Sequence, residues 1–510
     1  MSILPHDLRL ASIQQAVGFF DHRDRTTHDN ELRQGAANIL YQKLAFALSL
    51  NNRLEQDSYR IGGDVLTADH EISLLCNCLE MVHRASPDAI AATWYDVGED
   101  ILPILVKVME RPFLQHYGGE TKPNRDLKLA VQKVTKLLAM YSLVPEAKFP
   151  MVHCPGVLHA LVMIIDTRNL SRARLSIGGA SRCTGTGLVM TEAARFNTIA
   201  TLTNLAAAEE NRITMLQTEG LVDNIARIVQ NERSEVARQC SALAIMNLSN
   251  GDKDHVPEMA SELVLETLII LIKDELPETR RNAAVALFNV ACADANTLPV
   301  ARYKDGAILD AILEIICNDE IEESRTDAAE TLFNMSCSEE EETTNRMANH
   351  PGLLENVALV LHSPLASIDV KLYCAATLRR MAEIIVSPMP AQSIIMIALI
   401  KSATWTHTAD IAEGFQAHSE HVGNRKSMVE HVGLLHTLAQ LAQTDTPGAE
   451  GDKIRIAAIH CIENLAMHDR LQPVLASNED ILLALTKASY AEPGEGNPVQ
   501  VALRNLLAAV

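Results

Sequence analysis

The sequence predicts an all-α protein built from stacked repeats of roughly 40 to 47 residues. The main observation is a phrase that occurs twice, Glu278–Cys292 and then Glu323–Cys337, with an offset of 45 residues. The positions at which the two copies coincide include Arg280/Arg325, Ala283/Ala328, Leu287/Leu332, Phe288/Phe333 and Asn289/Asn334. Composition agrees, because 47% hydrophobic but only 4% aromatic residues suit close helix packing better than strands. At 510 residues the chain exceeds one ordinary core, and the repeats indicate an array in which each unit packs on its neighbours.

The chain is expected to begin with a cap and to continue as an array. Residues 1–86 hold two helical patterns separated by Gly62-Gly63, which we interpret as an irregular N-terminal helical cap for the exposed end of a repeat stack. The repeat array is predicted over residues 87–510. It is loose at 87–143 and clear from Pro145 onward.

An insert at residues 167–190 interrupts the array. It contains Arg168, Arg172, Arg174 and Arg182 and no acidic residue, together with several glycines. This composition is typical of a flexible, exposed loop. Two alternatives are a kinase site at Arg168-x-x-Ser171 and arginines that fold back onto an acidic groove.

The clearest repeat carries a recognisable motif. A short helix from Glu210 ends at Gly220, as helices often do, and a second helix over Leu221–Val229 and a third over Glu235–Leu248 follow. Asn211-Arg212, Glu219-Gly-Leu-Val and Ala242-Leu-Ala-Ile-Met-Asn-Leu-Ser together resemble the armadillo repeat, with echoes that begin at Asn345-Arg346 and Asn424-Arg425.

The resemblance implies a right-handed α-solenoid of roughly nine armadillo-like three-helix repeats. The chain departs from the pattern near Glu262, where the glycine between the first two helices is missing, and at 388–418, where the unit is short. It is not a close match to importin-α, whose tryptophans four residues before the anchor position are absent here, nor to β-catenin.

One anchor position recurs at the end of each third helix, at steps of 36 to 48 residues: Asn204, Asn247, Asn289, Asn334, Arg380, Gln416, Asn464 and Asn505. The resemblance implies that asparagines here hold the backbone of an extended peptide in a concave groove. An amide suits this role because it offers both a donor and an acceptor. The alternative is that each helix-end asparagine caps its own loop.

Residues seven and four positions before an anchor share its helical face. The candidate groove residues are therefore Asn204, Asn247, Asn289, Asn334, Asn282, Asp327 and Glu330. The acidic side chains near Asn334, which include Glu323, indicate a basic extended segment of a protein partner as ligand, or else are solvated charges. The net charge of −21 argues against nucleic acid as a partner, because such binders need clustered Lys and Arg.

Other charged sets are predicted to be structural. A basic residue stands nine positions before most anchors, as at Arg195, Arg280, Arg325 and Arg455, and we expect salt bridges between repeats or caps on carbonyl groups. His418, His421, His431 and His436 cluster, and we expect scattered surface histidines rather than a metal site.

The sequence therefore predicts a non-enzymatic scaffold for protein–protein interaction. No catalytic motif stands in a suitable context, and no cofactor is implied. Two alternatives are a transport or chaperone-type adaptor that carries cargo, and a substrate-recruiting or regulatory subunit of an enzyme complex.

The apolar run Ile384–Ile400 is broken by prolines and favours a buried helix over a membrane span. With no signal-peptide pattern and no CxxC pair, we expect a cytoplasmic location, with the nucleus as a second compartment.

Overall fold

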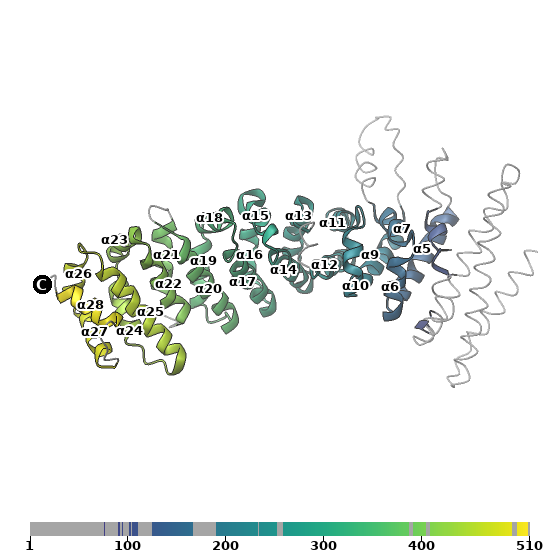
Figure 1. The fold of residues 1–510 in the computed structure, drawn as a ribbon. Coiled ribbons are helices and arrows are strands. Elements are labelled where there is room, and N and C mark those ends of the chain that lie inside the picture. Colours follow the sequence, from purple (N-terminus) through teal and green to yellow (C-terminus); the bar gives the residue numbers. More distant parts are fainter. Residues whose placement is uncertain are drawn as a thin grey trace, which may run out of the picture. The chain divides into compact units, whose positions relative to one another are not determined.

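All regular structure in the described residues is helical (Figure 1). The computed structural model describes residues 101–103, 105–110, 125–166, 190–232, 234–251, 259–386, 391–403, 408–491 and 497–507, with Cys76, residues 90–91 and Trp94. The chain forms two compact units, Met1–His255 and Val256–Val510, and each is treated by itself. The predicted cap at 1–86, apart from Cys76, and the predicted insert at 167–190, apart from Met190, lie outside the described residues.

The first unit contains the predicted succession of two shorter helices and one long helix. Its helices are α5 (Arg125–Tyr141), α6 (Pro145–His153), α7 (Val157–Ile165), α9 (Glu192–Ala206), α10 (Glu209–Leu216), α11 (Leu221–Asn231) and α12 (Glu235–Ser249). The long helices α5, α9 and α12 pack side by side in that order, while α6 packs on α10 and α7 on α11. Helices with the same place in the repeat therefore form parallel rows.

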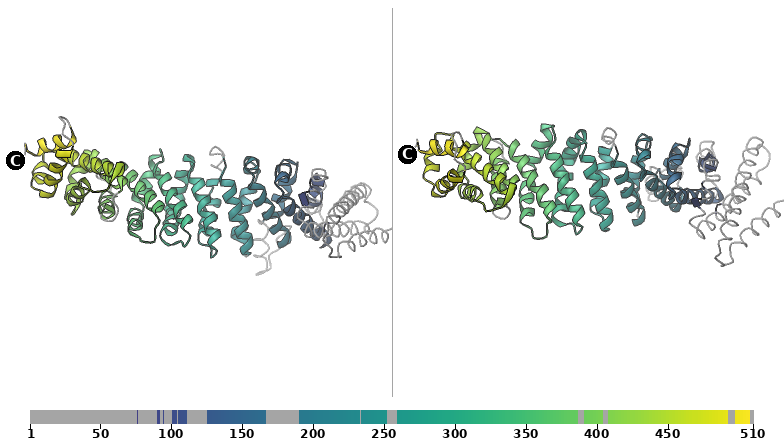
Figure 2. Two further views of the ribbon diagram at one scale, coloured as in Figure 1. Left: turned by 90° about the horizontal axis from the view of Figure 1, so that it is seen from below. Right: turned by 60° about the horizontal axis from the view of Figure 1, so that its bottom comes forward.

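The second unit continues the same plan. Its helices are α13 (Glu262–Ile272), α14 (Pro277–Ala291), α15 (Asp294–Arg302), α16 (Ala307–Asn318), α17 (Glu322–Ser336), α18 (Glu341–Asn349), α19 (Leu353–His362), α20 (Ile368–Ile384), α21 (Ala391–Ala403), α22 (Ala409–Glu420), α23 (Val422–Glu430), α24 (Leu434–Ala442), α25 (Gly448–Ala466), α26 (Gln472–Ala476), α27 (Glu479–Ala491) and α28 (Pro498–Leu507). The third helices α14, α17, α20, α22, α25 and α28 form one row, and the second helices α13, α16, α19, α21, α24 and α27 form another (Figure 2). With α5, α9 and α12 this makes nine third helices in the described part of the chain, in agreement with the predicted number of repeats.

Local sequence explains where the second helices begin. Gly156, Gly220, Gly306, Gly352 and Gly433 all have positive φ angles, between 74° and 101°, and each directly precedes a second helix. Only glycine adopts this conformation without steric cost, so it allows the sharp turn between the first two helices. At α13, where the sequence lacks this glycine, the Ser261 side chain instead accepts a hydrogen bond from the Val264 N–H, an N-cap worth about 1 kcal/mol.

The row of third helices is packed through small side chains. On α14, Ala283 and Ala286 are fully buried, and on α17 Ala328 and Ala329 are at most 2% exposed. Alanine at the contact lets helix axes approach closely, in agreement with the packing that the aromatic-poor composition predicted.

Among the described residues no single helix is long and apolar enough to cross a membrane. The helices α6 and α7 together are long and apolar enough, but the pair is bent by 88°.

Candidate functional site

The candidate residues of the second unit lie on neighbouring third helices. Asn282 and Asn289 are on α14, and Asp327, Glu330 and Asn334 are on α17. All five are half-buried, as expected for side chains on one open helix face. Asn204 and Asn247 belong to α9 and α12 of the first unit, so a single row of four asparagines across both units stays a prediction.

Four anchor asparagines bind the repeat before their own. Their Nδ2 atoms donate as follows: Asn204 to Ser142 Oγ (3.0 Å), Asn247 to the Thr203 carbonyl (3.3 Å), Asn334 to Cys292 Sγ (3.3 Å) and Asn464 to Ser419 Oγ (3.0 Å). Each acceptor lies near the end of the preceding third helix. These amides therefore join neighbouring repeats, and the alternative that they cap their own loops is wrong for these four.

The carbonyl oxygen Oδ1 of each of these four amides is a possible acceptor for a ligand. Within the described part of the chain, Oδ1 of Asn204, Asn247, Asn334 and Asn464 accepts no hydrogen bond. A carbonyl oxygen of this kind can accept a backbone N–H from a ligand. Each Nδ2 also carries a second hydrogen, so the pairing of donor and acceptor with one peptide stays a prediction.

The acidic side chains of α17 affect one another. The pKa of Asp327 is raised to about 6, mainly by burial and also by the nearby carboxylates of Glu330 and Glu323, while Arg281 of α14 acts to lower it. One guanidinium therefore does not balance the negative charge at this point of the face. A second cation would be stabilised there, because an opposite charge nearby favours the ionised carboxylate.

An aromatic residue that the sequence analysis did not single out completes this cluster. Tyr373 lies on α20 seven residues before Arg380, the same spacing that selects Asp327 on α17. Burial raises the pKa of Tyr373, as do the charge of Glu330 and a hydrogen bond with it. The Tyr373 ring lies 6.1 Å from that of Phe333, centroid to centroid. Extending the same-face spacing to α20 would have found it.

Arg380 and Gln416 interrupt the predicted row of asparagines. Arg380 pairs with Glu383 of its own helix, and the Gln416 Nε2 donates to Glu420 Oε1 (3.3 Å). Both anchor side chains are thus engaged by carboxylates of the same helix. The predicted candidate residues of the second unit lie on α14 and α17, and Tyr373 of α20 adjoins them. We call the surface formed by Asn282, Asn289, Asp327, Glu330, Asn334 and Tyr373 the α14–α17–α20 face.

The basic register is structural in three repeats, as predicted. Arg195 Nε lies 2.5 Å from Glu232 Oε1 of the next repeat, and Arg280 Nε lies 2.8 Å from Asp319 Oδ2. Arg325 instead donates to backbone carbonyls, those of Asp319 (2.8 Å) and Leu365 (3.2 Å). These bonds join successive repeats and cap loop carbonyls.

The prediction of surface histidines is wrong for His418. This side chain is fully buried, with Nδ1 within 3.1 Å of the Ala382 carbonyl oxygen, and burial lowers its pKa to about 4. The residue instead links α22 to the end of α20. His436 is exposed and lies 3.0 Å from Asp480. In the described residues no group of three or more metal-ligating side chains occurs.

The repeat geometry now identifies the fold. A short first helix, a second helix that follows a left-handed glycine and a long third helix recur in both units, and the third helices pack in rows. The chain has an armadillo-like repeat fold.

Comparisons with known proteins found similar chains among solved structures. No protein-family model matches the sequence, and no curated protein matches it significantly. Among solved structures, an engineered protein from a structural genomics consortium is 18% identical with a TM-score of 0.48, over 89% of this chain and 98% of that one. Two designed armadillo repeat proteins, one designed for modular peptide recognition and one in complex with the peptide (KR)4, are each 19% identical, over 55% of this chain and 99% of theirs, with TM-scores of 0.40 and 0.38.

Proposed function

We propose that this protein is a non-enzymatic interaction scaffold that binds an extended, basic segment of a protein partner on the α14–α17–α20 face. The observation that carries the proposal is the half-buried cluster of Asp327 and Glu330 beside Asn334. Its negative charge is incompletely balanced, with the pKa of Asp327 raised to about 6 by burial and by the neighbouring carboxylates.

The backbone of the ligand would be held by amide oxygens. Asn334 Oδ1 accepts no hydrogen bond from the described residues, and it faces the same way as Asp327 and Glu330 because spacings of four and seven residues return to one helix face. An extended segment presents N–H groups along its length. Such contacts give affinity without dependence on the ligand sequence.

The side chains of the ligand would be selected by charge. A Lys or Arg that approaches Glu330 and Asp327 would gain charge-assisted hydrogen bonds, and the adjoining rings of Tyr373 and Phe333 offer aromatic surface to its aliphatic stem and charge. Removing the repulsion between the two carboxylates adds to the gain.

Fluorescence polarisation with the full-length chain tests this function. The probe is a fluorescein-labelled peptide of about eight residues that alternates Lys and Ser, a length suited to an extended ligand, with a Glu–Ser peptide as the opposite-charge probe. The Lys peptide is expected to bind, and the double variant Glu330→Gln/Asn334→Ala should bind it about tenfold or more weakly, since charge-assisted contacts are worth about 1.5–3 kcal/mol.

Asn464→Ala is the matched control. Asn464 makes the same kind of bond to the preceding repeat (3.0 Å) but lies on α25, away from the acidic cluster in the chain. Its affinity for the Lys peptide should equal that of the wild type. Equal binding by the double variant and the wild type, or no preference for the Lys peptide over the Glu peptide, would rule out the proposed face.

A further inference from the structure

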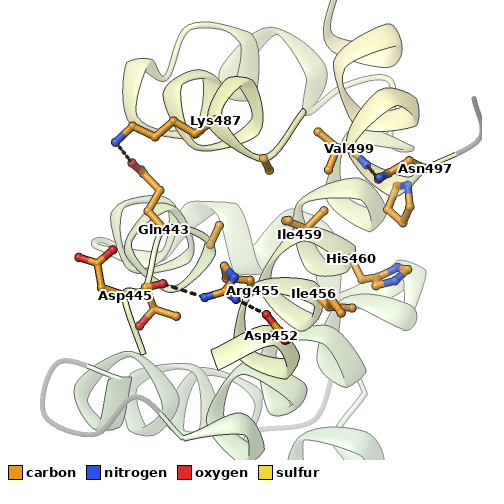
Figure 3. Close-up of a pocket in the computed structure, with 14 residues that line it drawn as sticks. Gln443, Asp445, Asp452, Arg455, Ile456, Ile459, His460, Lys487, Asn497 and Val499 are labelled. Carbon is orange, nitrogen blue, oxygen red and sulfur yellow. Dashed lines mark hydrogen bonds and ion pairs between the residues drawn. The ribbon is translucent and has the colours of Figure 1, made fainter. Parts of the chain in front are cut away.

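A cavity of about 440 Å³ lies between α25 and the helices α27 and α28 (Figure 3). Ile456, Ile459 and Val499 form an apolar part of its lining, and Arg455 and Lys487 bring two positive charges to it. A volume of this size is in the range of about 300–1,000 Å³ found for ligand pockets. None of these five residues belongs to the α14–α17–α20 face.

The cavity follows from the late start of the last described third helix. In α17 the helix begins at Glu322, twelve residues before Asn334, whereas α28 begins at Pro498, only seven residues before Asn505. The start of α28 is fixed by Asn497, whose Oδ1 accepts a hydrogen bond from the Val499 N–H (2.9 Å). Five residues of helix are about 7.5 Å long, and over that length α28 does not cover α25.

Arg455 differs from Arg195 and Arg280 in the same register, and like Arg325 it binds no carboxylate of the next repeat in the described part of the chain. Arg195 and Arg280 each bind a carboxylate that the next repeat supplies, Glu232 and Asp319 respectively. Arg455 instead binds Asp452 of its own helix and the Thr444 carbonyl (3.0 Å). In the described part of the chain no carboxylate of a later repeat lies against it, and the cavity occupies that side.

The remaining lining shows what chemistry would fill this space. Lys487 is exposed and its Nζ donates to the neutral Gln443 amide (2.7 Å). Asp445 and Asp452 also line the cavity, but Asp452 is already held by Arg455 and Asp445 is exposed at its edge (Figure 3). Ile456 is 46% exposed, so apolar surface stands next to the two cations.

We propose that this cavity is a second binding site, for an acidic and aliphatic peptide segment of a protein partner. An Asp or Glu side chain of that segment binds Arg455 and Lys487, in the place that the next repeat's carboxylate has at Arg195 and Arg280. A neighbouring aliphatic side chain covers Ile456 and Ile459. The charge preference is opposite to that of the α14–α17–α20 face, so the two sites select different ligands.

Fluorescence polarisation with two matched probes tests the site on the full-length chain. The probes are the fluorescein-labelled peptide amides Gly-Leu-Asp-Leu-Gly and Gly-Leu-Asn-Leu-Gly, which differ only in the carboxylate. The Asp peptide is expected to bind about tenfold more tightly than the Asn peptide, and its binding should weaken as salt rises.

Variants at exposed positions locate the site without disturbing the fold. Lys487→Gln removes one cation, and Ile456→Asn removes the aliphatic contact; each should weaken binding of the Asp peptide about fivefold or more. Lys453→Gln is the matched control, because Lys453 is exposed on the same helix but does not line the cavity. It should leave the affinity unchanged.

Three results would overturn the proposal. The first is equal affinity for the Asp and Asn peptides, or binding of neither. The second is an equal loss in Lys453→Gln and Lys487→Gln, which would indicate general attraction of charge. The third is Asp-peptide binding that occurs only after Glu492 and Glu495, acidic residues between α27 and α28 in sequence and outside the described residues, are both changed to Gln. The chain itself would then supply the carboxylate.

Discussion

Replacing Asp327 by Asn should make the protein more stable at neutral pH. Burial, together with the charges of Glu330 and Glu323, raises the pKa of Asp327 from 3.8 to about 6. Because this pKa is higher in the folded state than in the unfolded chain, the folded state binds more protons between about pH 4 and 6. Its stability therefore falls as the pH rises through that window. Asn carries no charge and escapes this loss.

The size of the effect follows from the shift. About two pKa units correspond to roughly 3 kcal/mol at 1.36 kcal/mol per unit, but the side chain is only half-buried, and screening by solvent reduces this to about 1 kcal/mol. For a unit of this length, 1 kcal/mol corresponds to about 2–4 °C in Tm. The gain should be absent below about pH 4 and complete above about pH 6.

Thermal unfolding of the full-length chain between pH 4 and 8 measures this difference. Glu314→Gln is a suitable control, because Glu314 is an exposed acid on α16 and its replacement should leave Tm unchanged throughout. A Tm for Asp327→Asn that is equal to or below the wild-type value at pH 7 would refute the reasoning. The same variant should bind the Lys peptide more weakly, so that a stabilising substitution weakens function, as is common at binding sites.

Three further predictions concern the fold. Burial lowers the pKa of His418 to about 4, so the unfolded chain takes up a proton before the folded chain as the pH falls from about 6.5 to 4. The free energy of unfolding should therefore drop by up to about 3 kcal/mol over this range. In urea unfolding, the difference in stability between pH 7 and pH 4.5 should be smaller for His418→Asn than for the wild type. Gly306→Ala should lower the free energy of unfolding by about 2–3 kcal/mol and Gly433→Ala by about 1 kcal/mol. A Cβ at Gly306 would lie 2.6 Å from an imidazole nitrogen of His350, whereas the nearest atom to a Cβ at Gly433 would lie at 3.7 Å. Measured Tm values should show the larger decrease for Gly306→Ala. Asn464→Ala should cost about 1 kcal/mol and Asn334→Ala less, because Asn464 donates to a hydroxyl and Asn334 to a sulfur, a weaker acceptor; equal losses in urea unfolding would contradict this ranking.

The repeat plan could be predicted because it is encoded locally. The duplicated phrase placed α14 and α17, and the glycines before Leu221 and Leu353 marked the start of second helices. Even the structural role of Arg280 could be predicted, since nine residues place it opposite the anchor on the helix.

The finer details of the site depend on neighbours distant in sequence. The acceptor for Asn334 is Cys292, one repeat earlier, and no pattern near Asn334 indicates it. Likewise, the burial of His418 results from its position against the end of α20. The cavity beside Arg455 depends on where α28 begins, and helix boundaries are the least certain part of a sequence-based prediction.

The amide bonds between repeats have a mechanical consequence for recognition. Within the second unit, Asn334 both faces the candidate ligand surface and holds α17 against the end of α14 through Cys292. Bending or stretching that separated these two helices would break this bond and turn the amide, changing the direction of its free oxygen. A ligand that needs that oxygen in one orientation would therefore favour one curvature of the repeats, and tension on the unit would alter its affinity.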